Sequence, residues 1–435
     1  MKKEKLIVNT ALLTGVSIVM SCIGMAYQVW LAGRIGAAGI GLFQLVMAVS
    51  GLAATVAISG IRFAATRLIS EELGLGRGAG VGGAMGRCLG YSLFFGLSAG
   101  AIMWCIAEPV GFLWIGDART VKSLRILSLS LPLISLSSVY SGYFTACGRV
   151  WKPALIHLIE QLTGIALVWV LLYAAPADDI EKSCAAIVTG GVAADLLCVV
   201  CMTGAYIGDR RGHPMSGGGG TRQTARMLAI AMPLAVSAYA RSALGTIEHL
   251  LVPRGLRRAG FSADSALAGY GVIQGMALPV VLFPACLMGA LSEVIVPELT
   301  KEQVSGGAEI PRTVRSVLIK SFLYALIVAA CMFVFADMLG TVIYHSSEAG
   351  RYIRLLAPLI PIMYTDTATD GCLKGLGQQV WSMGINILDA LLGVALVWFL
   401  LPKYALTAYI AIIYFGECLN FALSFGRLRK VMRDM

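Results

Sequence analysis

Long apolar segments follow one another along nearly the whole chain, and this repetition constrains its fold more than any other feature. The hydrocarbon core of a bilayer is ~30 Å thick, so a helix that spans it needs about 20 mostly apolar residues. Amphipathic surface, which the helices of a large soluble protein would need, is almost absent between the segments. The sequence therefore predicts an all-α membrane protein with about twelve transmembrane helices. The segments are 6–31, 38–61, 83–107, 124–146, 154–174, 185–207, 224–250, 266–295, 315–343, 351–372, 383–401 and 405–426.

The polar remainder of the chain is small. Only 13% of the residues are charged, about half of the ~25% usual in soluble domains, and the stretches between segments are too short to fold alone. We therefore expect no enzymatic activity and no cofactor. The eleven cysteines lie mostly within apolar segments, where they act as small hydrophobic side chains. The apolar run after Met1–Lys5 is too long for a cleaved signal peptide, so it is interpreted as the first helix.

Basic residues set the expected orientation. With the N-terminus in the cytoplasm, about two thirds of the 34 Lys and Arg residues fall on the cytoplasmic side, in agreement with the positive-inside rule. We predict a protein of the cytoplasmic (inner) membrane with both termini in the cytoplasm. One cluster does not fit, because Arg254, Arg257 and Arg258 fall in an outside loop. That loop needs a functional reason or a different topology.

An internal repeat divides the chain into two halves. At an offset of 229 or 230 residues, glycine, proline, arginine and tryptophan positions of the first half match those of the second. The glycine-rich stretch 213–223 has the composition of a flexible linker. We predict an N-terminal six-helix lobe over 1–212, this cytoplasmic linker, and a C-terminal six-helix lobe over 224–435. The matched positions are Arg125 with Arg354, Pro132 with Pro361, Gly142 with Gly371, Gly148 with Gly377, 164–169 with 393–398, and Gly39, Gly41 and Gln44 with Gly269, Gly271 and Gln274.

The even number of helices in each half makes the predicted repeats parallel. Both halves then enter the membrane from the same side and are related by an axis along the membrane normal. In transporters built from repeats, substrate sites lie near the bilayer midplane at the repeat interface. The expected working site therefore lies between the two lobes.

Four segments carry a family resemblance. Gly36–Leu45, Ile58–Ala64, Tyr270–Pro279 and Val296–Leu299 resemble stage V sporulation protein B-like polysaccharide flippases, which belong to the multidrug/oligosaccharidyl-lipid/polysaccharide (MOP) superfamily. The resemblance implies a V-shaped, two-lobed, MATE-like transporter. It also implies a lipid-linked saccharide substrate, such as a peptidoglycan or polysaccharide precursor.

The chain departs from these relatives in several respects. It has twelve predicted helices where many have fourteen, and it has Arg62 where relatives often have proline. Related lipid II flippases place arginines in the first helix, but this first helix is uncharged and offers only Asn9 and Gln28.

Arginines within or beside the predicted helices are candidates for contact with the substrate. Arg241, Arg62 and Arg254 are predicted to line the cavity, since the planar guanidinium group binds phosphate oxygens in a bidentate manner. Arg62 and Glu293 fall near matched positions of the two halves and are predicted to form a gate. Three alternatives stay open: Arg241 pairs with Glu248, Arg62 snorkels to lipid phosphates, and Arg254 is a solvated loop charge.

Acidic side chains in the tenth predicted helix are candidates for ion coupling. Asp366 and Asp370 lie one helical turn apart and are a candidate Na⁺ or H⁺ site, because ionisable groups inside a bilayer are costly and usually functional. The alternative is a structural carboxylate pair joined by Lys374. Glu160 and Asp389 match at the offset of 229, which suits structural helix-start or interface groups. His157, near Glu160, is either structural or part of a proton relay.

The leading functional hypothesis is a flippase that moves an anionic lipid-linked saccharide by alternating access. The alternatives are a multidrug or cation antiporter of the same superfamily and a non-transporting protein of envelope assembly. The expected partners are this saccharide, membrane lipids and a coupling H⁺ or Na⁺, with no nucleic acid, and the chain is expected to act as a monomer. The four histidines show no metal-ligand spacing, and Cys198–Cys201 matches a redox spelling only within an apolar helix.

Overall fold

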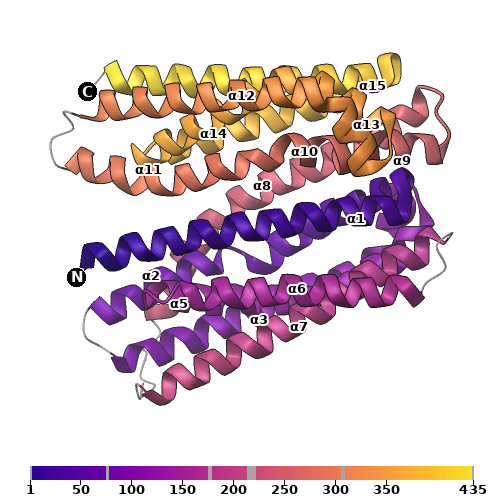
Figure 1. Cartoon of the computed structure of the whole chain (residues 1–435). Coiled ribbons are helices and arrows are strands. Elements are labelled where there is room, and N and C mark those ends of the chain that lie inside the picture. The colour runs from indigo at the N-terminus through magenta and orange to yellow at the C-terminus, as the bar shows by residue number, and fades with distance from the viewer. Residues whose placement is uncertain (1, 75–77, 175–178, 213–221, 305–308, 434–435) are drawn as a thin grey trace. The chain divides into compact units, whose positions relative to one another are not determined.

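The structure is a computed structural model that describes residues 2–74, 78–174, 179–212, 222–304 and 309–433. Within these ranges every regular element is a helix, and there is no strand (Figure 1). The α-helices are α1 (Lys2–Ile58), α2 (Ile61–Gly74), α3 (Gly78–Pro109), α4 (Val121–Ser128), α5 (Ser130–Ala146), α6 (Trp151–Ala174), α7 (Ile180–Gly212), α8 (Arg222–Arg258), α9 (Ala263–Gly271), α10 (Leu278–Leu282), α11 (Cys286–Val304), α12 (Ile310–Tyr344), α13 (Ser347–Leu356), α14 (Ile360–Gly375) and α15 (Gln379–Arg433). Short 3₁₀ or π turns are η1 (Val110–Ile115), η2 (Ala118–Thr120), η3 (Val272–Ala277), η4 (Phe283–Ala285) and η5 (Ala357–Leu359).

These helices account for the predicted membrane segments. Eight of the described helices are long and apolar enough to cross a bilayer, and the bent pair α4–α5 makes a ninth. The long helices α1 and α15 each contain two helices joined at a break, at Gly36 and at Ala405. With these breaks, and with α13–α14 as one further segment, each of the twelve predicted segments has a described counterpart. The predicted fold class, an all-α membrane protein, is confirmed.

The chain forms two compact units. Unit 1 comprises Met1–Val16 and Leu45–Thr246, and unit 2 comprises Ser17–Gln44 and Ile247–Met435. The predicted lobes 1–212 and 224–435 divide the chain at another place, and that division stays a prediction. Residues 213–221 of the predicted linker lie outside the described part of the chain.

Two matched positions of the sequence repeat have matched backbone geometry. Gly148 has φ of 69° and Gly377 has φ of 73°. Both values lie in the left-handed region, which glycine adopts without the steric cost that a Cβ brings. Gly148 follows α5, and Gly377 follows α14. The same residue type therefore ends equivalent helices in the two units.

An ion pair is repeated in the same way. Arg125 Nη2 lies 2.6 Å from Glu108 Oε1 in unit 1, and Arg354 Nη2 lies 2.6 Å from Asp337 Oδ2 in unit 2. All four residues obey the offset of 229. All four side chains are at least 41% exposed, so each pair is worth at most about 1 kcal/mol of stability. The two ion pairs show that the repeat in the sequence is also a repeat in the structure.

The helices that contain Pro132 and Pro361 are both interrupted shortly before the proline. α4 and α5 meet at Leu129 with a bend of 41°, and η5 interrupts the equivalent stretch between α13 and α14. A proline inside a helix removes one backbone hydrogen bond and clashes with the preceding turn. Short irregular turns thus interrupt both helices at these matched positions.

Glycines make a close backbone contact between two helices of unit 2. A Cβ on Gly271 would lie 2.8 Å from the amide nitrogen of Gly41 and against the carbonyl of Ala37. Conversely, a Cβ on Gly41 would meet the carbonyl of Leu267 and lie 3.3 Å from the amide nitrogen of Gly271. Ala37 and Leu267, like Gly41 and Gly271, are matched at the offset of 230. The contact is therefore reciprocal between two copies of one segment.

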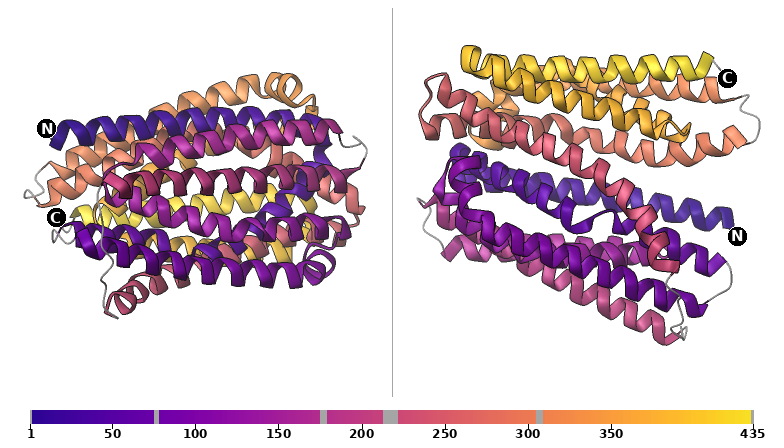
Figure 2. Two further views of the ribbon diagram at one scale, coloured as in Figure 1. Left: turned by 90° about the horizontal axis from the view of Figure 1, so that it is seen from below. Right: turned by 180° about the vertical axis from the view of Figure 1, so that it is seen from behind.

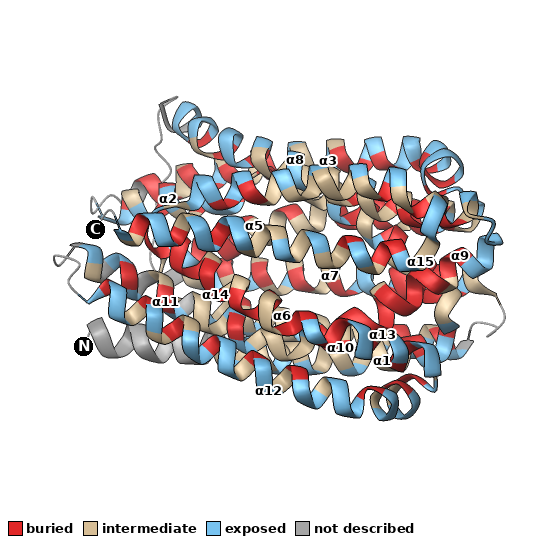
Figure 3. Ribbon diagram, turned by 90° about the horizontal axis from the view of Figure 1, so that it is seen from above, coloured by how far each residue is buried: buried red, intermediate tan, exposed pale blue. Residues whose placement is uncertain are grey.

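Buried and exposed residues are distributed as expected for a membrane protein. Within unit 1, α6 packs along α7, and α2 and α3 pack on α5 (Figure 2). Figure 3 shows exposed positions recurring along α12 and α8. Large apolar side chains are among them, including Ile327 and Val334 on α12, which are 65% and 67% exposed. In a bilayer such faces contact lipid, so their exposure has no hydrophobic cost.

Charged groups join three helices at one end of unit 1. Asp209 of α7, whose side chain is 7% exposed, accepts hydrogen bonds from Tyr143 of α5 at 3.0 Å and from Lys152 of α6 at 3.0 Å. Arg149, in the turn between these helices, also pairs with Asp209. A buried carboxylate needs such partners, because an unpaired charge away from water is strongly destabilising.

The position of Arg254, Arg257 and Arg258 corrects the sequence interpretation. These residues were expected in a loop after residue 250, but α8 continues through Arg258. Positive side chains are favoured in the last turn of a helix, where the backbone dipole leaves partial negative charge. Arg258 also stacks on Trp398, with 4.3 Å between the guanidinium carbon and the ring centroid. Their placement thus has a structural basis that the loop assignment lacked.

Candidate transport sites

Unit 1 contains a small polar pocket of about 170 Å³ within its helix bundle. Helices α5, α6 and α7 supply most of its polar side chains, and α2 supplies Arg62. The polar lining consists of Arg62, Ser137, Ser138, Ser141, His157, Glu160, Asp195 and Cys198. So many polar groups inside apolar helices indicate a functional or tightly paired cluster.

Hydrogen bonds connect the pocket residues. His157 and Glu160 lie three residues apart on one face of α6, and His157 Nδ1 lies 2.7 Å from Glu160 Oε2. The other ring nitrogen of His157 lies 3.4 Å from Ser141 Oγ. Asp195 hydrogen-bonds Glu160 from α7, and Cys198 Sγ lies 3.9 Å from His157 Nδ1. The imidazole therefore lies at the centre of the cluster.

Unit 2 contains a cluster of carboxylates. Asp366 and Asp370 project from α14, and Asp370 pairs with Lys374 Nζ at 2.5 Å and accepts a hydrogen bond from Ser382. Oδ1 of Asp366 is buried and has no hydrogen-bond partner among the described residues. Asp389 and Glu417 of α15 interact electrostatically with Asp366. The cluster has more anions than cations, and this imbalance favours a bound cation or proton.

Glycines make room for two further carboxylate contacts. A Cβ on Gly416 would lie 3.0 Å from Asp389 Oδ1, and a Cβ on Gly393 would lie 2.9 Å from Glu248 Oε2. Glu248, on α8, also interacts electrostatically with Asp389. The absence of side chains on the two α15 glycines thus lets carboxylates lie directly against the α15 backbone.

The pocket of unit 1 and the acidic cluster of unit 2 occupy matched positions. At the offset of 229, the pairs are Ser137 with Asp366, Ser141 with Asp370, Glu160 with Asp389, and Asp195 with Ser424. Ser424 also hydrogen-bonds Asp366 in unit 2. The same four helix positions therefore carry polar groups in both units, with serines and carboxylates exchanged at three of them.

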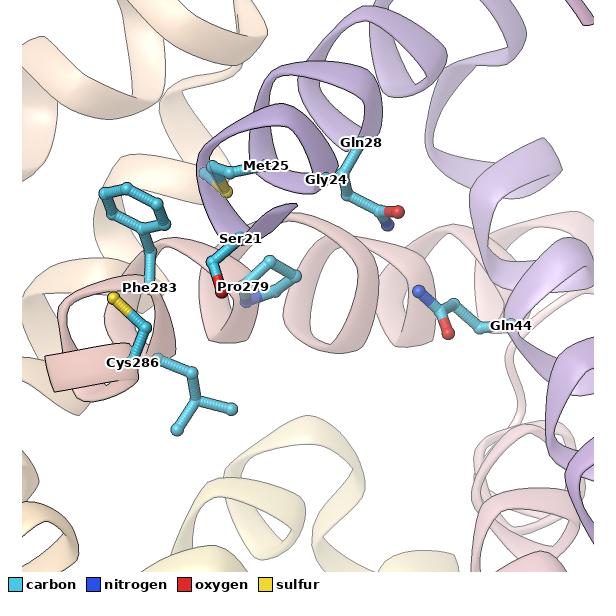
Figure 4. A pocket seen from close by; sticks show the side chains of 9 residues that line it. Ser21, Gly24, Met25, Gln28, Gln44, Pro279, Phe283 and Cys286 are labelled. Carbon is cyan, nitrogen blue, oxygen red and sulfur yellow. The ribbon is translucent and has the colours of Figure 1, made fainter. Parts of the chain in front are cut away.

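A second, larger pocket lies within unit 2 and has a volume of about 470 Å³. It is formed by the first helical part of α1, the start of the second part, and the stretch α10–η4–α11. Figure 4 shows the amide groups of Gln28 and Gln44 turned toward the space between these helices. Its lining carries no charge and consists of Ser21, Gly24, Met25, Gln28, Gln44, Pro279, Leu282, Phe283 and Cys286. Gln28 also donates to the carbonyl of Gly275 at 3.1 Å.

The predicted cavity and gate residues have different environments. Arg62 is exposed and lines the pocket of unit 1. Arg241 is exposed on α8, and Arg254 is half-buried near Arg257 and Arg258. Glu293 belongs to α11, but its side chain lies outside the described residues. The proposed roles of these residues as cavity lining and gate therefore stay predictions.

Sequence reasoning missed several members of both clusters. Glu417 carries no signal except that it is acidic within an apolar segment, and Glu248 stands out only as a partner for Arg241. No local pattern marks Asp195, and Cys198 belongs only to a redox spelling within an apolar helix. Each joins at least one residue on a different helix, so no spacing along the sequence brings it to the site.

The helical fold, with its long apolar helices, is that of a multi-pass membrane protein. The model of the polysaccharide biosynthesis protein family matches residues 6–303, and the MatE model matches residues 259–399. The chain belongs to the polysaccharide biosynthesis protein family. The family resemblance inferred from the four sequence segments is confirmed.

Two relatives are similar to this chain in sequence, and a solved structure is similar to it in fold. The chain is 23% identical over 416 residues to stage V sporulation protein B of Bacillus subtilis (strain 168), covering 93% of this chain and 80% of that protein. It is 24% identical over 266 residues to the sporulation protein YkvU of the same organism, covering 58% of this chain and 59% of that protein. A multidrug resistance MATE family transporter in an inward-facing conformation has the same fold, with a TM-score of 0.74, 14% identity, and coverage of 98% and 99%.

Proposed function

We propose that this protein is a flippase that moves an anionic lipid-linked saccharide across the cytoplasmic membrane by alternating access. The saccharide is of the kind used as a peptidoglycan or polysaccharide precursor. The observation that carries the proposal is the uncharged pocket of unit 2, with its two glutamine amides. We place both termini in the cytoplasm and expect a monomer.

The pocket of unit 2 has the chemistry that a sugar requires. Amide and hydroxyl groups such as those of Gln28, Gln44 and Ser21 donate to and accept from sugar hydroxyls. Phe283 and Pro279 offer apolar surface to the C–H faces of a sugar ring. Ligand sites are mostly apolar pockets of ~300–1,000 Å³ with a few placed polar groups, and this pocket falls within that range. A fixed charge, which an uncharged sugar does not need, is absent from its lining.

The phosphate of the substrate is assigned to arginines. Arg62 is proposed to bind it in the unit 1 pocket, and Arg241 and Arg254 to bind it along α8. The planar guanidinium group suits phosphate oxygens. The polyprenyl-type tail stays in lipid during transfer, so only the head group passes through the protein. Arg62 and Glu293 are proposed to close one mouth of the passage.

The acidic cluster of unit 2 is proposed to couple transport to a cation. Asp366 and Asp370 are its centre, and Asp389 and Glu417 add further oxygen donors. Carboxylate oxygens inside a bilayer are stabilised by protonation or by a bound cation. Since the membrane potential contributes about 2.3 kcal/mol per charge per 100 mV, movement of an anionic head group out of a negative interior is itself favourable.

A multidrug or cation antiporter is the second candidate. The observation that favours it is the same acidic cluster, since positively charged compounds seek carboxylates in a low-dielectric site. The MatE match over 259–399 includes Asp366, Asp370 and Asp389. The neutral pocket favours the saccharide, and the acidic cluster favours the cation, so the two functions are distinguished by substrate.

The test is transport by purified protein in proteoliposomes, with a fluorescent lipid-linked saccharide in one set and a cationic dye in another. We expect saccharide flipping, and a loss of about 2–10-fold in Gln28→Leu because one hydrogen bond contributes about 0.5–1.5 kcal/mol. Met25→Leu, in the same pocket, is the matched control and keeps wild-type transport. Arg241→Ala tests the phosphate assignment.

Three results would count against the proposal. Dye export without saccharide flipping favours the antiporter. Equal saccharide flipping by wild type and Gln28→Leu removes the neutral pocket from the mechanism. Folded protein that moves neither compound supports a non-transporting role in envelope assembly.

A further inference from the structure

Three side chains in the unit 1 pocket bring an imidazole, a carboxylate and a thiol together. The ligand atoms of His157, Glu160 and Cys198 all lie within 4.8 Å of one another. His157 Nδ1 lies 2.7 Å from Glu160 Oε2 and 3.9 Å from Cys198 Sγ. In a tetrahedral zinc site with bonds of ~2.0–2.3 Å, ligand atoms lie about 3.3–3.8 Å apart. Small side-chain rotations therefore suffice to place these three atoms around one ion.

The second nitrogen of His157 is already supported in the manner of a metal ligand. Histidine that binds a metal through one ring nitrogen usually donates a hydrogen bond from the other, which fixes the tautomer and the ring orientation. His157 Nε2 lies 3.4 Å from Ser141 Oγ. With Nδ1 on the ion, Nε2 carries the proton and donates to this hydroxyl. Ser141 thereby orients the imidazole.

Asp195 is the natural fourth ligand. It lines the same pocket and hydrogen-bonds Glu160 from α7. A divalent ion would replace the proton that two hydrogen-bonded carboxyl groups share. With a thiolate at Cys198, the pocket holds three anionic ligands, the Arg62 cation and a divalent metal, and these charges balance. Metal binding releases the thiol proton.

The donor set selects the class of metal. Thiolate and imidazole ligands favour Zn²⁺, whereas carboxylate and carbonyl oxygens favour Mg²⁺, Ca²⁺ and Mn²⁺. At the matched positions unit 2 carries oxygen donors, namely the carboxylates of Asp366, Asp370 and Asp389 and the hydroxyl of Ser424. The two clusters thus occupy equivalent helix positions but differ in the softness of their donors.

We propose that the unit 1 pocket is a Zn²⁺ site formed by His157, Glu160, Cys198 and Asp195. The side chains of His157 and Glu160 are 35% and 22% exposed, which leaves a route for the ion. Cys198 lies 41 residues beyond His157, so spacing along the sequence gave no sign of the site. The proposal stands independently of the transported substrate.

Metal titration of the whole purified protein in detergent tests the site. After treatment with a chelator, Co²⁺ is added as a spectroscopic probe and is then displaced by Zn²⁺. We expect one Co²⁺ per chain, a sulfur-to-cobalt charge-transfer band in the near ultraviolet, and the intense visible bands of tetrahedral Co²⁺. Cys198→Ser should lose the charge-transfer band, and Cys201→Ser, one turn along α7, should keep it.

Two further variants separate a metal site from a structural hydrogen-bond cluster. Glu160→Gln keeps the shape and the thiol, so it should retain the charge-transfer band but weaken Zn²⁺ binding. Ser141→Ala should weaken binding by about 10–100-fold, the range for loss of a supporting partner. Wild-type protein that binds no Co²⁺ or Zn²⁺ at one per chain would overturn the proposal. So would binding that Cys198→Ser and Glu160→Gln leave unchanged, and Glu160→Gln decides the matter if Cys198→Ser does not fold.

Discussion

The reciprocal glycine contact between Gly41 and Gly271 yields the sharpest stability prediction. Replacing Gly271 with alanine places a Cβ 2.8 Å from the amide nitrogen and 3.1 Å from the Cα of Gly41. These neighbours are backbone atoms, so no side chain can rotate away and the helices themselves must separate. Overpacking of this kind costs about 1–3 kcal/mol, and we expect the upper end of that range.

Two comparisons isolate the contact from the general effect of alanine in a helix. A Cβ at Gly51, farther along the second helical part of α1, would meet no atom within 4 Å. Gly51→Ala should therefore be neutral or stabilising by up to about 1 kcal/mol through helix propensity. Gly41→Ala should resemble Gly271→Ala, and the double variant should cost less than the sum, because the first substitution has already separated the helices.

The assay is thermal unfolding of purified protein in detergent, followed by tryptophan fluorescence. A change of 1 kcal/mol in the free energy of unfolding shifts the midpoint by about 2–4 °C for a domain of 150–250 residues. Each half of this chain falls within that size range. Gly271→Ala should then melt roughly 6–12 °C below wild type by the same relation. A midpoint equal to that of Gly51→Ala, or strictly additive losses in the double variant, would refute the reasoning.

Three further predictions concern charge, coupling and backbone geometry. Asp209→Asn should cost about 1.5–3 kcal/mol, because the neutral amide loses the hydrogen bonds that the charged carboxylate accepts; Glu108→Gln removes an exposed pair and should cost at most about 1 kcal/mol in the same melts. Addition of the coupling cation should raise the melting midpoint of the wild type. At a cation concentration of 100 times its Kd, the free energy of unfolding increases by about 2.7 kcal/mol. Asp366→Asn should abolish that rise, whereas the exposed Asp337→Asn should keep it; a rise that persists in Asp366→Asn contradicts the coupling proposal. Gly148→Ala should cost about 1–2 kcal/mol, because alanine is strained at positive φ; an unchanged midpoint would show that the turn adapts.

Local patterns predicted the helices because a membrane helix is specified by its own composition. The apolar segments and the repeat could be recognised without knowing any contact, and matched residues such as Arg125 and Arg354 do form matched ion pairs. The loop predicted at Arg254 is wrong because charged residues do not by themselves end a helix, and α8 continues through Arg258. The helix dipole in fact favours basic side chains at that end.

The polar clusters were only partly predictable because they join distant helices. Asp366 and Asp370 stand out in the sequence since they are one turn apart in an apolar segment. Glu417 and Cys198 reach their clusters only through packing of α15 and α7, and sequence spacing carries no record of that packing. The reciprocal approach of α1 and α9 likewise depends on two segments 230 residues apart.

The reciprocal contact has a consequence for how this chain arose. Gly41 lies against the segment around Gly271, and Gly271 lies against the segment around Gly41. Such a reciprocal contact is typical of the interface of a two-fold symmetric homodimer. A single six-helix ancestor could thus have paired with its own copy through one glycine face. In such a dimer every substitution appears twice. In a single chain that carries both copies this constraint is absent, and the matched positions 137 and 366 hold serine in one half and aspartate in the other.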